Sequence, residues 1–154
     1  MDISVIVVTY NSANQIATCL QSVLKQTGVT FEVVVVDNAS ADTTLAQLAN
    51  FDVRVIANQE NLGFGRGNNL GFVTSCGRYI YLLNPDARLV GKNSLTELCR
   101  IMDANPRWGM AGTLIRSADG KSTSLRPPFI PARGTSGATF QNCLERSRGF
   151  WARA

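Results

Sequence analysis

Two short, almost uninterrupted runs of apolar and mostly β-branched residues constrain the fold of this chain more than any other feature. The first covers Ile3 to Thr9 and the second covers Phe31 to Val36. Both are too short for a typical helix, and neither alternates between apolar and polar residues, so each predicts a strand that is buried on both faces. Such strands occur in parallel sheets covered by helices, which indicates an α/β protein.

Further strands and helices are predicted to alternate along the chain. Short strands are expected at 53–56, 78–83 and 108–115. Amphipathic helices are expected after Ser12, where Ser12 and Gln15 fit a capping box, near Leu45 and Leu48, and over 68–76 and 94–102. This order predicts a mainly parallel sheet flanked by helices.

Composition excludes several classes of protein. The longest aliphatic runs are far too short to cross a bilayer, and the amino terminus lacks the pattern of a secretory signal. The absence of histidine excludes Ser-His and Cys-His catalysis and any His-ligated zinc site. The cysteines show no paired metal-ligand spacing, so we expect reduced thiols in a cytoplasmic protein, with Cys19 and Cys99 facing the core. The four are Cys19, Cys76, Cys99 and Cys143.

The basic balance of the chain belongs to its C-terminal third. Residues 1–106 hold seven Lys/Arg and nine Asp/Glu, whereas residues 107–154 hold eight and two. No nucleic-acid motif accompanies this charge, so we expect no nucleic-acid partner; an anionic substrate or a peripheral contact with an anionic membrane fits it equally well. We predict an α/β domain over residues 1–117 and a basic, Pro/Gly/Ser-rich tail over 118–154 that is poorly ordered or extended.

Three polar loops follow predicted strands. They begin at Thr9-Tyr10-Asn11, at Asp37-Asn38-Ala39-Ser40 and at Asn84-Pro85-Asp86. The carboxyl ends of parallel strands meet at one edge of a sheet, which is where ligands bind in open α/β folds. We therefore expect the three loops to converge there.

The side chains of these loops suit a nucleoside diphosphate. An aromatic ring such as Tyr10 can stack on a base, and a carboxylate such as Asp37 can accept from a base N–H or from ribose. A second carboxylate, Asp86, can hold a divalent cation against a diphosphate. Each residue also has a purely structural interpretation: Tyr10 as a half-buried ring, and Asp37 and Asp86 as helix-cap or turn residues. Gly63, Gly65, Gly67 and Gly71 match neither a P-loop nor a dinucleotide fingerprint, which indicates tight turns and close helix packing instead.

Five motifs carry a resemblance to a known family. They are Val5-Ile6-Val7-Val8-Thr9-Tyr10-Asn11, Val34-Val35-Val36-Asp37-Asn38-Ala39-Ser40-Ala41-Asp42, Glu60-Asn61-Leu62-Gly63-Phe64, Asn68-Asn69-Leu70-Gly71 and Leu82-Leu83-Asn84-Pro85-Asp86. In this order they resemble the family 2 inverting glycosyltransferases, and within them the rhamnosyltransferase-like branch. The resemblance runs from about residue 3 to about residue 120. It implies a GT-A fold, a Rossmann-like nucleotide-sugar-binding domain that is incomplete here at the C-terminus.

The resemblance also implies roles for particular residues. Asp86 matches the metal-binding position of the family's Asp-X-Asp motif, in which Asn84 replaces the first acid, and Mg²⁺ or Mn²⁺ is the implied cofactor. Asp37 matches the acid that reads the uracil or thymine ring. The positions implied for nucleotide binding are Thr9, Tyr10, Asn11, Asp37, Asn38, Ser40, Asn61, Gly63, Asn68 and Asn84. Asn68-Asn69 stands where many members have Arg-Asn, which weakens the case for Asn68.

The implied reaction is inverting transfer of a sugar from a dTDP- or UDP-sugar, such as dTDP-rhamnose, to an acceptor hydroxyl in cell-surface polysaccharide synthesis. The implied acceptor is a glycan or a lipid-linked sugar, at the inner face of the membrane. No residue matches the family's later acidic motif that supplies the catalytic base, so we expect a truncated product or a fragment. Two alternatives stay open. One is a fragment that binds nucleotide-sugar without turnover. The other is a nucleotidyltransferase or other nucleotide-binding α/β protein, which the missing phosphate-binding glycine signatures disfavour.

Overall fold

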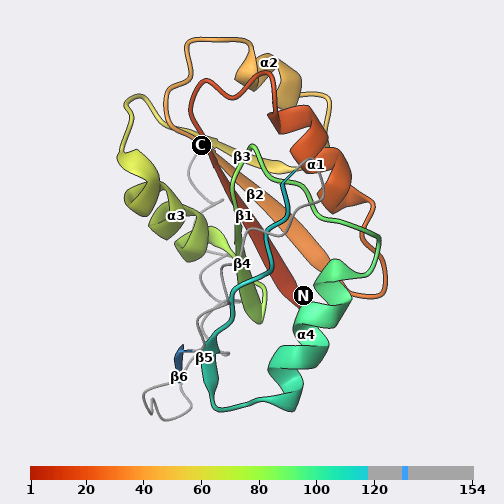
Figure 1. Ribbon diagram of the computed structural model, residues 1–154. Helices are drawn as coiled ribbons and strands as arrows, with labels where there is room; N and C mark the ends of the chain where they lie inside the picture. The colour runs from red at the N-terminus through yellow and green to blue at the C-terminus, as the bar shows by residue number, and fades with distance from the viewer. Residues whose placement is uncertain (118–129, 132–154) are drawn as a thin grey trace. The chain divides into compact units, whose positions relative to one another are not determined.

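The structure is a computed structural model, and it describes residues 1–117 and 130–131 of the chain. It divides into two units, Met1–Cys99 and Arg100–Ala154. The first unit holds nearly all of the regular structure (Figure 1). The predicted tail over 118–154 lies outside the described residues apart from 130–131.

A four-stranded parallel sheet forms the centre of the first unit. Its strands are β1 (Ile3–Thr9), β2 (Phe31–Asp37), β3 (Arg54–Ala57) and β4 (Tyr79–Leu83), arranged in the order β3-β2-β1-β4. Thr9 lies opposite Asp37, and Val7 lies opposite Leu83. Every residue of β1 and the last five of β2 are buried, which confirms the prediction from the two apolar runs.

Helices cover both faces of this sheet, as predicted. The buried residues of α1 (Ile16–Leu24), α2 (Thr44–Leu48) and the start of α4 (Ser94–Ala104) share one core cluster with Val5, Val7, Val33 and Val35. The α3 helix (Gly63–Thr74) packs on the opposite face, where Val8, Val34 and Val36 form a smaller cluster with Leu70 (Figure 1). Cys19 and Cys99 are buried in the larger cluster, as expected.

The close packing of α3 depends on two glycines. A Cβ atom at Gly71 would lie 2.5 Å from Ile6 Cγ2, and one at Gly67 would lie 2.8 Å from Val8 Cγ1. Real Cβ atoms do not approach so closely, so only glycine allows the helix backbone to lie this near β1. The prediction of close helix packing is confirmed. However, α3 starts at Gly63, five residues before the expected start, because tertiary packing overrides the low helix propensity of glycine.

Three other local expectations were wrong. The capping box at Ser12 does not form: α1 begins at Ile16 without a side-chain cap, and the Ser12 hydroxyl contacts Tyr10 within its own loop. The strand expected over 108–115 is only β5 (Trp108–Met110), which pairs antiparallel with β6 (Ile130–Pro131) rather than joining the main sheet. Finally, the apolar run at 79–83 predicts a buried strand, whereas β4 is an edge strand among the described residues, with Leu82 exposed and only Leu83 buried.

None of the helices in the described part of the chain has the length and apolar character needed to cross a membrane.

Candidate functional site

The candidate site lies at the carboxyl edge of the parallel sheet. The chain leaves β1 for one face of the sheet, through α1, and it enters β4 from the other face, through α3. The direction of winding therefore reverses between neighbouring strands β1 and β4, and the crevice at such a switch point is the usual ligand site of open α/β sheets. Tyr10 and Asn84 directly follow these two strands. The predicted convergence of the three loops on one edge is confirmed.

Asp37 is the most enclosed acid at this edge. It is fully buried as the last residue of β2, and its carboxylate accepts three hydrogen bonds. Thr9 Oγ1 donates to Oδ1 at 2.8 Å, Ser40 Oγ donates to Oδ1 at 2.6 Å, and the Ser40 backbone N–H donates to Oδ2 at 2.9 Å. Burying a carboxylate is costly unless hydrogen bonds such as these replace its contacts with water. Three of the predicted residues are thus brought into one cluster.

Two strained residues shape the loops above this cluster. Asn11 has φ 50° and Ala39 has φ 60°, a region that residues other than glycine rarely occupy. The Asn11 backbone N–H donates to Ser40 Oγ at 2.8 Å, and Asn11 Oδ1 accepts from the Ala41 N–H at 2.8 Å. These reciprocal bonds join the loops after β1 and β2, and they offset the strain at both positions.

Asp42 makes a further connection between the same two loops. Its carboxylate accepts from the backbone N–H of Thr44 at 2.9 Å and from that of Ala13 at 3.1 Å, and it also bonds the Thr44 hydroxyl. The bond to the Thr44 side chain is the main reason that the pKa of Asp42 is lowered. Asp42 is therefore a structural acid. Its bond from the backbone N–H two residues later forms an Asx turn, which is a common use of Asp in loops.

The predicted asparagines have different environments. Asn38 is buried, and its side chain bonds the Gly63 carbonyl and the Asn58 amide, so it joins the loop after β2 to the start of α3. Asn68 is also buried and donates to the Phe64 carbonyl within α3. Asn61 is exposed, and its Oδ1 accepts from the Gly63 N–H at 2.8 Å. Asn38 and Asn68 therefore have internal structural roles in this conformation.

Tyr10 and Asp86 are the accessible members of the predicted site. The Tyr10 residue is 53% exposed at the start of its loop, so it is accessible to a ligand at this edge. Asp86 and Asn84 are also exposed, in a turn where the Ala87 N–H donates to the Asn84 carbonyl at 3.0 Å. A ligand at this edge can reach both side chains without unfolding either loop.

The turn after β4 rests on a buried thiol of α1. Cys19 Sγ lies 3.6 Å from the Asn84 carbonyl oxygen. Burial, reinforced by the nearby Asp86 carboxylate, raises the pKa of Cys19 to about 12. The thiol therefore stays protonated and acts as the donor. Sequence reasoning placed Cys19 in the core but missed this contact; the available signal was that Cys19 and Ser22 share one helical face.

The donor set at Asp86 fits a cation that is shared with a substrate. Nowhere in the described residues do three acidic or cysteine side chains gather into a metal site. The turn offers one carboxylate at Asp86 and one amide oxygen at Asn84, both exposed. Mg²⁺ is typically held by one or two carboxylates together with phosphate oxygens and water, so these residues fit Mg²⁺ or Mn²⁺ bound to a diphosphate and do not fit an all-protein cage.

Comparisons with known proteins agree with this geometry. The family model described as Glycosyl transferase family 2 matches residues 4–153. The succinoglycan biosynthesis protein ExoO of Rhizobium meliloti (strain 1021) is 44% identical over 88 residues, which are 55% of this chain and 25% of that protein. An uncharacterised protein of Mycobacterium tuberculosis is 37% identical over 112 residues, 71% of this chain and 34% of its own length. The chain thus spans about a quarter to a third of these relatives.

Solved structures show the same architecture. The structure of S. aureus TarS 1–349 in complex with UDP-GlcNAc matches 75% of this chain and 40% of that one, with 25% identity and a TM-score of 0.64. A mannosyltransferase from Pyrobaculum calidifontis, in complex with GDP-Man and Mn²⁺, matches 75% of this chain and 35% of that one, with 25% identity and a TM-score of 0.68. The predicted GT-A fold is confirmed, and the chain corresponds to part of such a domain.

Proposed function

The chain belongs to glycosyl transferase family 2, and from this premise we propose that it binds the nucleotide diphosphate of an activated sugar at the carboxyl edge of its sheet. The observation that carries the proposal is the position of Tyr10 and Asp86. They follow β1 and β4, the two strands that flank the switch point, and both are exposed. Solved relatives hold UDP-GlcNAc or GDP-Man, which supports a nucleotide-sugar as the ligand class.

The base is proposed to lie between Tyr10 and Asp37. The exposed Tyr10 ring would stack on it, since every base presents a π-face. Asp37 Oδ2 accepts one bond, from Ser40, which leaves a second lone pair for a base N–H. Uracil and thymine each present one ring N–H, and Asp37 matches the acid that reads these bases in the family it resembles, so we propose UDP or dTDP as the nucleotide. Because Asp37 is fully buried, the loop that carries Ser40 must shift before the base can reach it.

The diphosphate is proposed to bind beside Asp86, with Mg²⁺ or Mn²⁺ as cofactor. Asp86 would be the protein's carboxylate ligand, and Asn84 would contact the cation or the phosphates. A bound cation would stabilise the negative charge that develops on the departing diphosphate. The Mn²⁺ in the mannosyltransferase complex supports a divalent cation as the cofactor.

The wider reaction proposed is inverting transfer of the sugar to a hydroxyl of a glycan or a lipid-linked acceptor. The rhamnosyltransferase-like motifs favour dTDP-rhamnose as donor, and the similarity to a succinoglycan biosynthesis protein favours cell-surface polysaccharide. We propose that the protein acts in the cytoplasm, with peripheral contact of its basic C-terminal third at the inner membrane face.

A second candidate function is nucleotide-sugar binding without turnover. It is favoured because no residue of this sequence matches the acidic motif that the family resemblance implies for the catalytic base. Assays of donor hydrolysis and of sugar transfer separate the two candidates, since a pure binder gives neither product.

Calorimetry on the full chain tests the donor site. UDP and dTDP would each be titrated in EDTA and in Mn²⁺, with wild-type chain and with Asp86→Ala. The proposal expects tighter binding in Mn²⁺ and loss of that gain in Asp86→Ala. Equal affinity of the wild-type chain in EDTA and Mn²⁺ would contradict the role of Asp86.

Asp52→Ala is the matched control. Asp52 is an exposed acid just before β3, so it lies at the amino edge of the sheet, away from the candidate site. Its replacement changes the net charge by the same amount and should leave the Mn²⁺-dependent gain intact.

A further inference from the structure

The α1 helix and Gln26, which follows its C-cap residue, hold the segment after β4 through three polar side chains, which we call the α1 ladder. Cys19 Sγ donates to the Asn84 carbonyl at 3.6 Å. Ser22 Oγ accepts from the Leu89 N–H at 3.0 Å. Gln26 Nε2 donates to the Gly91 carbonyl at 2.7 Å. Cys19 and Ser22 are spaced i and i+3, so they lie on one face of α1, and Gln26 extends the ladder just past the end of the helix.

Each attachment is itself fixed to the helix or to the core. Ser22 Oγ donates to the Cys19 carbonyl at 2.7 Å, which orients the hydroxyl to accept from Leu89. Gln26 is 5% exposed, and its amide also donates to the Ser22 carbonyl and accepts from the Leu95 N–H at 3.2 Å. A buried side chain with all of these partners has little freedom to move, so the ladder is a rigid support.

The ladder brackets the exposed Asp86. The first attachment is two residues before it, at Asn84, and the second is three residues after it, at Leu89. An exposed turn with no such support would sample many positions, and the conformational entropy lost when a cation orders it would reduce the affinity. Fixed points on both sides of Asp86 remove most of this entropy cost.

We propose that Cys19 and Ser22 are positioning residues that set the affinity of the Asp86 turn for its divalent cation. The proposal rests on the proposed donor site, because it explains how Asp86 is held rather than what it binds. Neither side chain touches the ligand, and both act through the backbone of the turn. Residues of this kind around metal ligands typically change metal affinity by about 10- to 100-fold when they are removed.

The experiment compares UDP affinity in EDTA and in Mn²⁺ on the full chain and takes their ratio as the metal-dependent gain. Mn²⁺ electron paramagnetic resonance gives the affinity for the cation independently of any activity. Cys19→Ala and Ser22→Ala are each expected to reduce the gain by about tenfold, the low end of that range, with little change in the EDTA affinity. Cys19→Ser keeps a donor of similar size and should retain the gain.

Cys99→Ala is the control for the loss of a buried thiol. Cys99 is buried in the same core cluster, on α4. Its replacement should lower the stability by a comparable amount without changing the metal-dependent gain in UDP affinity. Thermal unfolding of every variant separates the two effects. If Cys19→Ala does not fold, Ser22→Ala and Cys19→Ser decide the question.

The outcomes distinguish this inference from the donor site itself. If Asp86→Ala abolishes the gain while Cys19→Ala and Ser22→Ala leave it unchanged, the ladder is only structural and the inference is wrong. A gain lost equally in Cys19→Ser, Cys19→Ala and Cys99→Ala would also contradict it, because core packing would then be the cause. If the wild-type chain shows no gain, the proposed donor site fails and the inference fails with it.

Discussion

Thr9 and Asp37 end neighbouring parallel strands at the same level of the sheet, and the Thr9 hydroxyl donates to the Asp37 carboxylate at 2.8 Å. Both residues are fully buried. The acid proposed to read the base is therefore also an internal acceptor that fixes the end of β2. Its structural and binding roles can be separated, because Thr9 and Ser40 are its donors within the protein whereas the base N–H is its proposed donor from the ligand.

Asp37→Asn should impair both roles. The amide offers one acceptor oxygen where the carboxylate offers two, and its NH₂ group faces hydroxyl or N–H donors. We expect a loss of about 1–3 kcal/mol in the free energy of unfolding, measured with denaturant, because a buried donor loses its acceptor. UDP affinity should fall as well.

Thr9→Val is the companion variant, since it keeps the shape of the side chain and removes only one donor. It should lower the free energy of unfolding by about 1 kcal/mol and leave the Asp37 carboxylate with its two bonds from Ser40. A loss of UDP affinity in Thr9→Val equal to that in Asp37→Asn would contradict a direct contact between Asp37 and the base.

The backbone of the site could be predicted from the sequence, whereas the state of its side chains could not. Ile3–Thr9 and Phe31–Asp37 are buried on both faces, and such burial leaves a continuous apolar pattern. Parallel pairing then fixes which edge receives the loops. The bonds of Asp37 and the φ of Asn11 depend on contacts between separate loops, and no local pattern encodes those contacts.

The start of α3 illustrates a second limit of prediction. Local propensity opposes a helix over Gly63 to Gly67, so the sequence predicts a helix only from residue 68. The helix forms because Gly67 and Gly71 let it lie against Val8 and Ile6, and the burial gained compensates for the weak propensity. Only the packed structure shows which glycines are needed for contact and which are not.

Gly71→Ala should destabilise the protein, and Gly65→Ala should not. The added methyl at residue 71 meets Ile6 at 2.5 Å, and overpacking of this kind costs about 1–3 kcal/mol. Gly65 lies in the same helix with nothing within 4 Å of the added atom, so alanine should be neutral or stabilising by about 0.5–1 kcal/mol. Urea denaturation of the two variants tests the difference; equal effects would contradict the packing argument.

Loss of the Asp42 contacts should appear on acidification. The pKa of Asp42 is lowered from 3.8, chiefly by its bond to the Thr44 side chain, so the folded state favours the carboxylate. The contribution of Asp42 to stability is fully present at pH values above its pKa in the unfolded chain. It is lost as the pH falls through its lower pKa in the folded protein. The melting temperatures of the wild-type chain and Asp42→Ala should therefore converge below pH 3.8 and differ above it. A difference that is constant from pH 7 to pH 2 would contradict this role.

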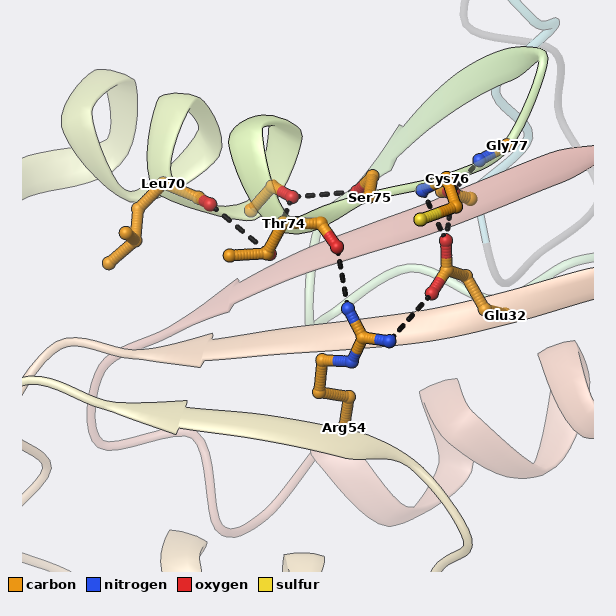
Figure 2. Close-up of polar contacts among 9 residues, drawn as sticks. Glu32, Arg54, Leu70, Thr74, Ser75, Cys76 and Gly77 are labelled. Atoms are coloured by element: carbon orange, nitrogen blue, oxygen red, sulfur yellow. Dashed lines mark hydrogen bonds and ion pairs between the residues drawn. The ribbon is translucent and has the colours of Figure 1, made fainter. Parts of the chain in front are cut away.

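Glu32 holds together the amino edge of the sheet, opposite the candidate site (Figure 2). Its Oε1 accepts from the Ser4 hydroxyl at 2.6 Å and from the Cys76 N–H at 2.7 Å, and its Oε2 lies 3.5 Å from the Arg54 guanidinium. The Glu32 side chain is 13% exposed and that of Arg54 is 51% exposed. The two partners of this ion pair should therefore contribute very different amounts to stability.

Glu32→Ala is expected to cost about 1–3 kcal/mol of unfolding free energy, because the fully buried Ser4 hydroxyl loses its acceptor. Arg54→Ala should cost less than about 1 kcal/mol, as is usual for a half-exposed ion pair. Guanidinium denaturation measures both changes. UDP affinity in Mn²⁺ should be unchanged in each folded variant, because this network lies at the edge of the sheet where the strands begin, whereas the nucleotide is proposed to bind where they end. Arg54 also donates to the Thr74 carbonyl. If Arg54→Ala cost as much as Glu32→Ala, the contacts of Arg54 rather than the bonds of Glu32 to Ser4 and Cys76 would be the main stabilising ones.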